Sequence, residues 1–410
     1  MDYVTSRASA AREDRHAWAE SGVEALGGGL YRIPLPLPGD ALTAVNVYAM
    51  VGDDGVDLID AGMAIAAARE RLTEALGQLG YGLPDVRNFF ITHIHQDHYT
   101  LAVQLRTTLR GQVTLGDQER ANMAAIRDVS AGRAEVGFIQ MLAPMGAADL
   151  ADRVRALLAP RLADPQPKLE WSDPDQWLSD GAVIELPGRT LRAIHTPGHT
   201  TGHVVFHEEA AGLLFAGDHV LPHITPSIGF QPVITRSSLS QYLDSLRLML
   251  ALPDATLLPA HGPVQASTHA RVHQLLEHHE TRLEQTLEAA TDGPVTAFQV
   301  AGVLPWTRRK RRLTELDVMN QLLATGETAA HLEVLVTRGQ LVRERSPEGV
   351  DFYRLPPATA DDLSSASANG LPPATDRPPA SANGLPPATD RPPASANGLP
   401  PATAGDLAGE

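Results

Sequence analysis

The segment "THIHQDH" contains four side chains that bind metal ions well, within a stretch of six consecutive residues. They are His93, His95, Asp97 and His98, and they directly follow the apolar run "NFFI". The chain has no cysteine, so nitrogen and oxygen atoms are the only strong metal ligands that it offers. Imidazoles with carboxylates suit Zn²⁺, and Fe or Mn as well, because no thiolate selects for zinc. The cluster indicates a metal site; the alternative is a buried structural histidine or a solvated loop.

Three further candidate ligands lie far along the chain. His199 lies in "TPGHTTGH", Asp218 in "AGDHV" and His261 in "LLPAHGP". Each follows an apolar run with the pattern of a buried strand. A metal site built on loops after strands would gather side chains at such long intervals.

The surrounding pattern alternates strands with helices. Residues 30–62 have short apolar runs separated by turn signals, residues 64–80 have apolar residues at helical spacing, and "VRNFFI" is again a strand pattern. Residues 101–163 are predicted to be mostly helical, residues 190–221 return to strands, and residues 237–252 form an amphipathic helix. This order predicts an α/β fold whose rigid sheets position polar loops at the strand ends.

The motifs "THIHQDH", "TPGHTTGH", "GDH" and "PAHG", with "LIDAG" upstream, resemble in type and order those of the metallo-β-lactamase-fold hydrolase superfamily. The resemblance covers about residues 25 to 270. It implies an αββα sandwich, in which two sheets lie face to face with helices outside. It also implies two divalent metal ions per chain, expected to be Zn²⁺, with Fe or Mn as alternatives.

The resemblance also assigns roles. His93, His95 and His199 would hold the first ion, Asp97, His98 and His261 the second, and Asp218 would bridge the two. Two ions about 3.5 to 4 Å apart would present a shared hydroxide to the substrate. Asp97 would be the catalytic residue, orienting this hydroxide and transferring its proton.

Other polar residues near the motifs have weaker predictions. Asp60, in "LIDAG", is expected to orient a ligand or a loop. His219, His223 and Tyr99 are candidates for substrate contact or support, and Gln96 and Tyr99 are candidates for setting substrate preference. Packing or supporting roles are expected for His195, His203 and His207. Solvated helix positions are expected for His269, His273, His278, His279 and His331.

The metal motif predicts a class of reaction and leaves the substrate open. An apolar cluster, formed by Phe138, Ile139, Met141, Leu142 and Met145, favours helix packing, with a lid over an acyl chain as the alternative. We expect a small-molecule acyl substrate, a thioester or related carboxylic ester. A non-catalytic binding module is disfavoured, because every motif ligand is present.

Residues 271–356 have helical patterns followed by a hairpin pattern around Pro347-Glu348-Gly349, which predicts a winged-helix-like domain. It resembles a module found in glyoxalase-II-like hydrolases, acyl-carrier-protein thioesterases and an endoribonuclease. Five basic residues, Arg308 to Arg312, follow Trp306, so RNA bound with Trp306 as a stacking platform is the alternative function. The net charge of −16 makes it the less favoured one.

We predict four segments: an N-terminal extension (1–24), a catalytic domain (25–270), the winged-helix-like domain (271–356) and a disordered tail (357–410). The tail contains a 14-residue repeat rich in Pro and Ala, with units beginning at Ser367, Ser381 and Ser395. A polar start and the absence of an apolar run of about 18 residues predict a cytoplasmic location without membrane contact. The oligomeric state is left open.

Overall fold

A computed structural model describes residues 17–20, 22–39, 42–109, 111–163, 171–307 and 309–357. The described residues up to Leu355 belong to one compact unit. Most of the predicted N-terminal extension and the repeat tail from residue 358 lie outside the described residues. No described helix combines the length and the apolar character that crossing a membrane requires.

The first sheet contains seven strands that follow one another in chain order. Strands β1 to β4 pair antiparallel, and β4 to β7 pair parallel. Their bounds are β1 Glu24–Gly27, β2 Leu30–Pro36, β3 Ala44–Gly52, β4 Gly55–Ile59, β5 Val86–Phe90, β6 Gln112–Gly116 and β7 Gln176–Leu178. Every residue of β4 is buried, because both faces of the sheet are covered.

The second sheet has the strand order β12-β11-β10-β9-β8. Its bounds are β8 Val183–Leu186, β9 Arg189–His195, β10 Val204–Glu208, β11 Leu213–Gly217 and β12 Thr256–Pro259. The two sheets bury one core between them, in which the rings of Tyr48 and Phe215 meet edge to face with centroids 5.4 Å apart. Phe90 and Phe206 make a similar contact at 6.2 Å.

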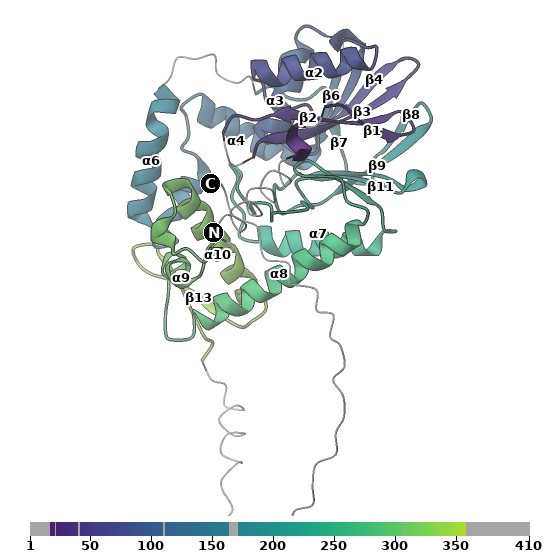
Figure 1. Cartoon of the computed structure of the whole chain (residues 1–410). Helices are drawn as coiled ribbons and strands as arrows, with labels where there is room; N and C mark the ends of the chain where they lie inside the picture. Colours follow the sequence, from purple (N-terminus) through teal and green to yellow (C-terminus); the bar gives the residue numbers. More distant parts are fainter. Residues whose placement is uncertain are drawn as a thin grey trace, which may run out of the picture. The chain divides into compact units, whose positions relative to one another are not determined.

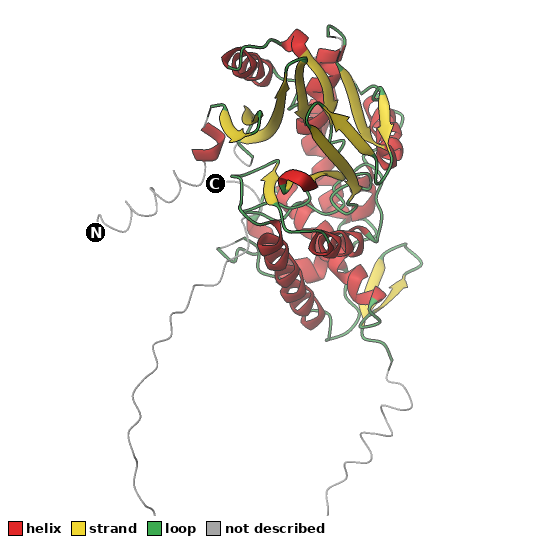
Figure 2. Cartoon of the chain, turned by 90° about the vertical axis from the view of Figure 1, so that its right-hand side faces the viewer, coloured by secondary structure: helices red, strands yellow, loops and turns green. Residues whose placement is uncertain are grey.

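Helices cover the outer faces of both sheets (Figures 1 and 2). Buried leucines of α2 (Ala66–Gln78) and α3 (Gln96–Arg106) pack on the first sheet. Those of α7 (Ser238–Ala251) and α8 (Thr268–Glu288) pack on the second. The layers are therefore helix, sheet, sheet and helix, which confirms the predicted sandwich.

Three more helices lie between β6 and β7 along the chain, namely α4 (Arg120–Ser130), α5 (Gly137–Leu142) and α6 (Ala148–Ala163). Strand β6 interrupts the region predicted to be mostly helical.

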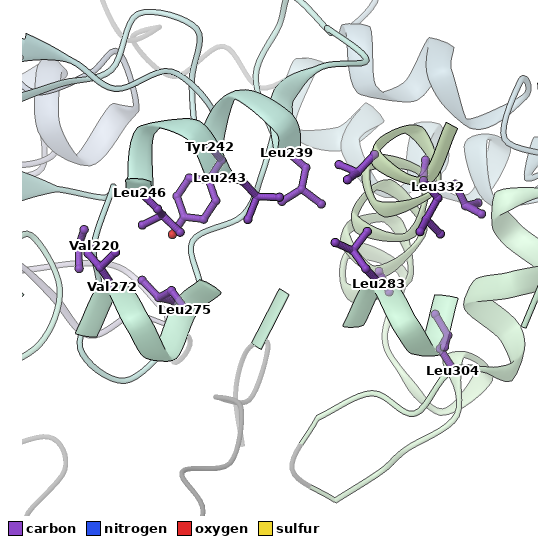
Figure 3. Close-up of a cluster of buried hydrophobic side chains, with 14 of the residues drawn as sticks. Val220, Leu239, Tyr242, Leu243, Leu246, Val272, Leu275, Leu283, Leu304 and Leu332 are labelled. Atoms are coloured by element: carbon purple, nitrogen blue, oxygen red, sulfur yellow. The ribbon is translucent and has the colours of Figure 1, made fainter. Parts of the chain in front are cut away.

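The C-terminal part is mainly helical and packs on the sandwich. It contains α9 (Ala297–Val303), α10 (Val318–Thr337) and the hairpin of β13 (Val342–Arg345) and β14 (Asp351–Arg354). One continuous apolar cluster joins Leu239 of α7, Leu283 of α8 and Leu332 of α10 (Figure 3). The predicted boundary at residue 270 falls in the first turn of α8. The order of helices followed by a hairpin agrees with the prediction. That this part is a winged-helix domain stays a prediction.

The expectation that His279 and His331 are solvated was wrong, and Trp306 does not provide the stacking platform of the disfavoured RNA alternative. His279 and His331 are each only 1% exposed, and their rings stack with centroids 5.4 Å apart, so they are core residues. Burial holds the pKa of both well below the usual range, and that of His331 at about 3. Trp306 is also buried, since its indole N–H donates to the Ala301 carbonyl and the Arg282 guanidinium covers its ring. Trp306 therefore offers no face on which a base could stack.

Candidate metal centre

The candidate ligands meet at the carboxyl ends of strands from both sheets. His93 and His95 follow β5, Asp218 follows β11 and His261 follows β12. His199 lies on the turn between β9 and β10. Because β11 and β12 run parallel, their carboxyl ends lie at the same end of the second sheet, and the residues after them lie close together. The sandwich thereby brings together side chains from widely separated positions in the chain.

The seven side chains form two groups, and within each the donor atoms lie within 4.8 Å of one another. One group is His93, His95, His199 and Asp218, and the other is Asp97, His98 and His261. In the first group, His199 Nε2 lies 2.9 Å from His95 Nδ1 and 3.2 Å from His93 Nε2. In the second, His261 Nε2 lies 3.3 Å from an oxygen of Asp97.

Asp218 faces both groups. Its Oδ2 lies 3.4 Å from His199 Nε2 in the first group. Its Oδ1 lies 3.4 Å from His261 Nε2 and 3.7 Å from His98 Nε2 in the second. Gly217, in the left-handed region at φ 50°, permits this approach, because a Cβ there would lie 2.7 Å from His203 Nε2.

Backbone carbonyls orient the imidazoles. His199 Nδ1 donates to the Ser227 carbonyl at 2.6 Å, His95 Nε2 to the Phe230 carbonyl at 2.9 Å, and His261 Nδ1 to the Ala44 carbonyl at 2.8 Å. A carbonyl only accepts, so each of these nitrogens carries the ring proton. In His95 and His199, whose pKa burial lowers, the other nitrogen is left with a lone pair that faces the centre, as a metal ligand requires. Asp218 and Asp97 raise the pKa of His261, so its Nε2 would release a proton when a cation binds.

Asp60 supports the second group. Its carboxylate accepts a hydrogen bond from His98 Nδ1 at 2.9 Å and from the backbone N–H of Thr92 at 2.8 Å. Its backbone lies in the left-handed region at φ 59°, which is a strained conformation for a residue other than glycine. Asp60 thus occupies the position of a residue that orients a ligand, as the sequence predicted for it.

The imidazoles of the two groups differ in charge state. Burial lowers the pKa of His93, His95 and His199, that of His199 to about 3, so these rings are neutral. Burial opposes a charge on His98 as well, but Asp60, Asp97 and Asp218 outweigh it and raise its pKa to about 10. The same carboxylates would attract a metal cation.

Three buried polar atoms of the centre have no hydrogen-bond partner among the described residues. They are His98 Nε2, His261 Nε2 and Asp218 Oδ1, and they face one another. Unsatisfied buried polar atoms are costly and rare in native proteins. The convergent nitrogen and oxygen donors therefore fit divalent cations, which the residues of the two groups would hold.

A pocket of about 230 Å³ opens beside His95. Gln96 lines it, and its influence on substrate preference stays a prediction. Trp171 and Phe230 supply part of the apolar wall. Tyr99 is fully buried and does not line this pocket; its hydroxyl donates to the Ser172 carbonyl at 2.7 Å and its ring stacks on Trp171. Tyr99 therefore contacts a pocket residue, Trp171, without lining the pocket itself.

The two histidines after Asp218 lie outside this pocket. His219 has no exposed surface, and its ring packs on Tyr242 with centroids 5.3 Å apart. His223 is exposed. His203, predicted to have a supporting role, accepts a hydrogen bond from the Asp218 backbone N–H at 3.1 Å.

Gln231 is a pocket residue that the sequence analysis missed. Its Oε1 accepts from the Thr201 backbone N–H at 2.7 Å and from Asn122 Nδ2 at 2.8 Å, while its buried Nε2 has no partner among the described residues. Since the oxygen is held by two donors, the amide nitrogen is the free end. A single glutamine in a loop has no pattern by which the sequence alone could have identified it.

Comparison with known proteins agrees with this geometry. Residues 40–261 match the metallo-beta-lactamase superfamily, and residues 283–356 match the metallo-beta-lactamase-like C-terminal domain. The lactamase-like protein ptaB of Pestalotiopsis fici is 35% identical over 131 residues, which are 32% of this chain and 39% of that protein. The lactamase-like protein aptB of Emericella nidulans is 38% identical over 106 residues, or 26% of this chain and 32% of that protein. The alignments thus span less than half the length of these relatives.

Two solved structures share the fold over most of the chain. A metallo-beta-lactamase family protein from Thermus thermophilus is 28% identical, with a TM-score of 0.61, covering 81% of this chain and 100% of that one. A beta-lactamase domain protein from Burkholderia ambifaria is 26% identical, with a TM-score of 0.65, covering 82% of this chain and 94% of that one. The family match extends over more than half of the chain and includes all seven clustered residues. The chain therefore belongs to the metallo-beta-lactamase superfamily.

Proposed function

We propose that this protein is a metal-dependent hydrolase that cleaves a thioester or a related carboxylic ester of a small acyl substrate. The observation that carries the proposal is the position of Asp218, whose two oxygens face two separate groups of ligand atoms. The first group would hold one divalent ion and the second group another, with Zn²⁺ the expected metal. When bound, such ions supply an activated water and polarise the oxygen of the bond under attack.

The chain's own residues complete the site. The Asp97 side chain is about 20% exposed, more than the buried Asp218, and lies on the approach to His261. In this proposal Asp97 orients the attacking water and accepts its proton. Gln96 and the free amide of Gln231 offer hydrogen bonds to the substrate, and Trp171 and Phe230 exclude water from its apolar part.

RNA cleavage is the less supported function of the same fold. It would need a surface that holds a single strand, and buried Trp306 cannot stack on bases. The observation in favour of this alternative is that basic residues next to Trp306, namely Arg309, Lys310 and Arg312, are exposed. These side chains could contact the phosphates of a nucleic acid.

A two-substrate assay separates these functions. The zinc-loaded protein is tested on acyl-CoA and S-acyl glutathione thioesters and on single-stranded RNA, in parallel with a variant in which Arg309, Lys310 and Arg312 are replaced by Gln. We expect thioester turnover that is the same in both proteins within about twofold, because these exposed side chains do not line the pocket. RNA cleavage that requires the basic residues, without thioester turnover, would reverse the assignment.

A further inference from the structure

A second cavity shares two lining residues, Phe138 and Phe230, with the pocket that opens beside His95. Its walls come from α5 and the turn after it, from residues 227–238 and from α10. Its volume is about 90 Å³, and that of the pocket beside His95 is about 230 Å³. Together they reach the lower end of the range for small-molecule sites, which begins at about 300 Å³. We call it the α10 cavity.

Two aromatic side chains separate the two spaces. Phe138 and Phe230 line both of them and stack on each other, with centroids 4.7 Å apart and planes at 21°. The carbonyl of Phe230 also accepts the hydrogen bond from His95 Nε2. The aromatic pair thus connects the metal centre, the pocket and the α10 cavity.

The α10 cavity is built for an apolar group. Met141, Met145 and Leu323 supply part of its apolar wall, and methionine side chains adapt readily to the shape of a ligand. The charged groups on the other wall bind one another, since Arg236 pairs with Glu333 and with Asp351, each at 2.8 Å. Glu327 also lines the cavity, and burial raises the pKa of its carboxyl, which favours the neutral form.

We propose that the α10 cavity holds the far end of the substrate's acyl chain, which reaches it past Phe138 and Phe230. This inference rests on the proposed function, because the carbonyl under attack would lie beside His95. At roughly 30 Å³ for a group of the size of a water molecule, the cavity has room for about three methylenes. The substrate class is then a thioester or ester of a medium-length aliphatic acid, and short acyl groups would leave the cavity empty.

Gly326 of α10 provides a way to fill the cavity without altering the metal centre. It lines the cavity, and a Cβ built at this position would meet no atom within 4 Å. Gly326→Leu places four carbons in the space and also improves helix propensity. Gly326→Ala is the matched small substitution. Gly77→Leu is the control, since Gly77 lies on the exposed face of α2 and also has open space around its Cβ.

The test compares butyryl and decanoyl thioesters as substrates of the zinc-loaded proteins. Burying a methylene is worth about a fourfold change in affinity, so filling the space of three should lower kcat/KM for the decanoyl substrate roughly 50-fold. The butyryl substrate should be unaffected in Gly326→Leu and in Gly326→Ala, and both substrates in Gly77→Leu. Gly326→Ala adds one carbon to the cavity, so it should lower kcat/KM for the decanoyl substrate by about fourfold at most. Equal effects of Gly326→Leu on both chain lengths, or no effect, overturn the proposal.

A binding measurement keeps this inference separate from the proposed activity. Calorimetry with decanoate and butyrate on the metal-free proteins should show decanoate binding that Gly326→Leu weakens and Gly77→Leu preserves. If decanoate binds in this way but no thioester is hydrolysed, the proposed function fails and the acyl site stands. If thioesters are hydrolysed without dependence on chain length, or if neither binding nor hydrolysis occurs, the acyl site is refuted.

Discussion

Replacing Asp60 by Asn should weaken metal binding without unfolding the protein. The Asp60 carboxylate accepts from His98 Nδ1 and from the Thr92 backbone N–H, and an amide can accept only at its one oxygen. Whichever way the amide turns, one donor loses its acceptor. Without an acceptor at Nδ1, His98 is free to carry its proton on Nε2, the nitrogen that faces the centre. Asparagine tolerates the left-handed backbone at this position, so the turn itself is preserved.

The loss should be about 10- to 100-fold in metal affinity, or about 1.4 to 2.7 kcal/mol, as for other residues that orient a metal ligand. Competition with a chromogenic chelator measures it. The control is Asp57→Asn on β4, the strand that Asp60 directly follows; Asp57 is equally buried and loses an ion pair with Arg87 at 2.6 Å, but does not touch the centre. Wild-type metal affinity in Asp60→Asn, or an equal loss in both variants, would refute the reasoning.

Further predictions concern the pocket and the C-terminal core. Gln231→Glu keeps the oxygen that binds Thr201 and Asn122 but removes the free donor; we expect KM to rise up to about tenfold at unchanged metal content, measured by steady-state kinetics and elemental analysis. His331 is buried and neutral with its pKa lowered to about 3, so the unfolded state gains protons first as the pH falls below about 6.5. Stability should therefore fall by about 1.4 kcal/mol per pH unit for this residue between those pKa values, and urea unfolding at several pH values should show a shallower slope in His331→Leu.

Much of the metal centre could be predicted from the sequence, because its ligands follow strands and strand ends are where a sheet gathers polar loops. His93, His95, Asp97 and His98 lie in one short segment, and the fold brings His199, Asp218 and His261 to them. The alternation of strand-length apolar runs with helical patterns predicted an α/β fold, and the resemblance to a known superfamily supplied the layer order. The resemblance to a known superfamily supplied the pairing of ligands into two groups.

Side-chain environments within the helical part could not be predicted. On α8, His279 has polar neighbours in the sequence, and its burial depends on His331 of α10, 52 residues later. Trp306 stands beside a basic run, but Arg282 of α8 covers its ring. Periodicity places a residue on a face of its own helix, and only the tertiary structure determines what that face meets.

The pocket was the least predictable part. Tyr99 follows the metal motif, yet it points into the core on the far side of Trp171. Gln231 lies 109 residues from Asn122, whose amide fixes its orientation. Such positions depend on loop conformations that have no repeating pattern in the sequence.

The central claim is that seven side chains would hold two metal ions, and that Asp218 would contribute to the binding of both. Elemental analysis of purified protein after saturation with zinc and removal of the excess tests it most directly, in the wild type and in His199→Ala and His261→Ala. These variants remove one ligand from the first and second group respectively. We predict two ions per chain in the wild type and one in each variant. A single ion in the wild type, or two ions in both variants, would contradict the account.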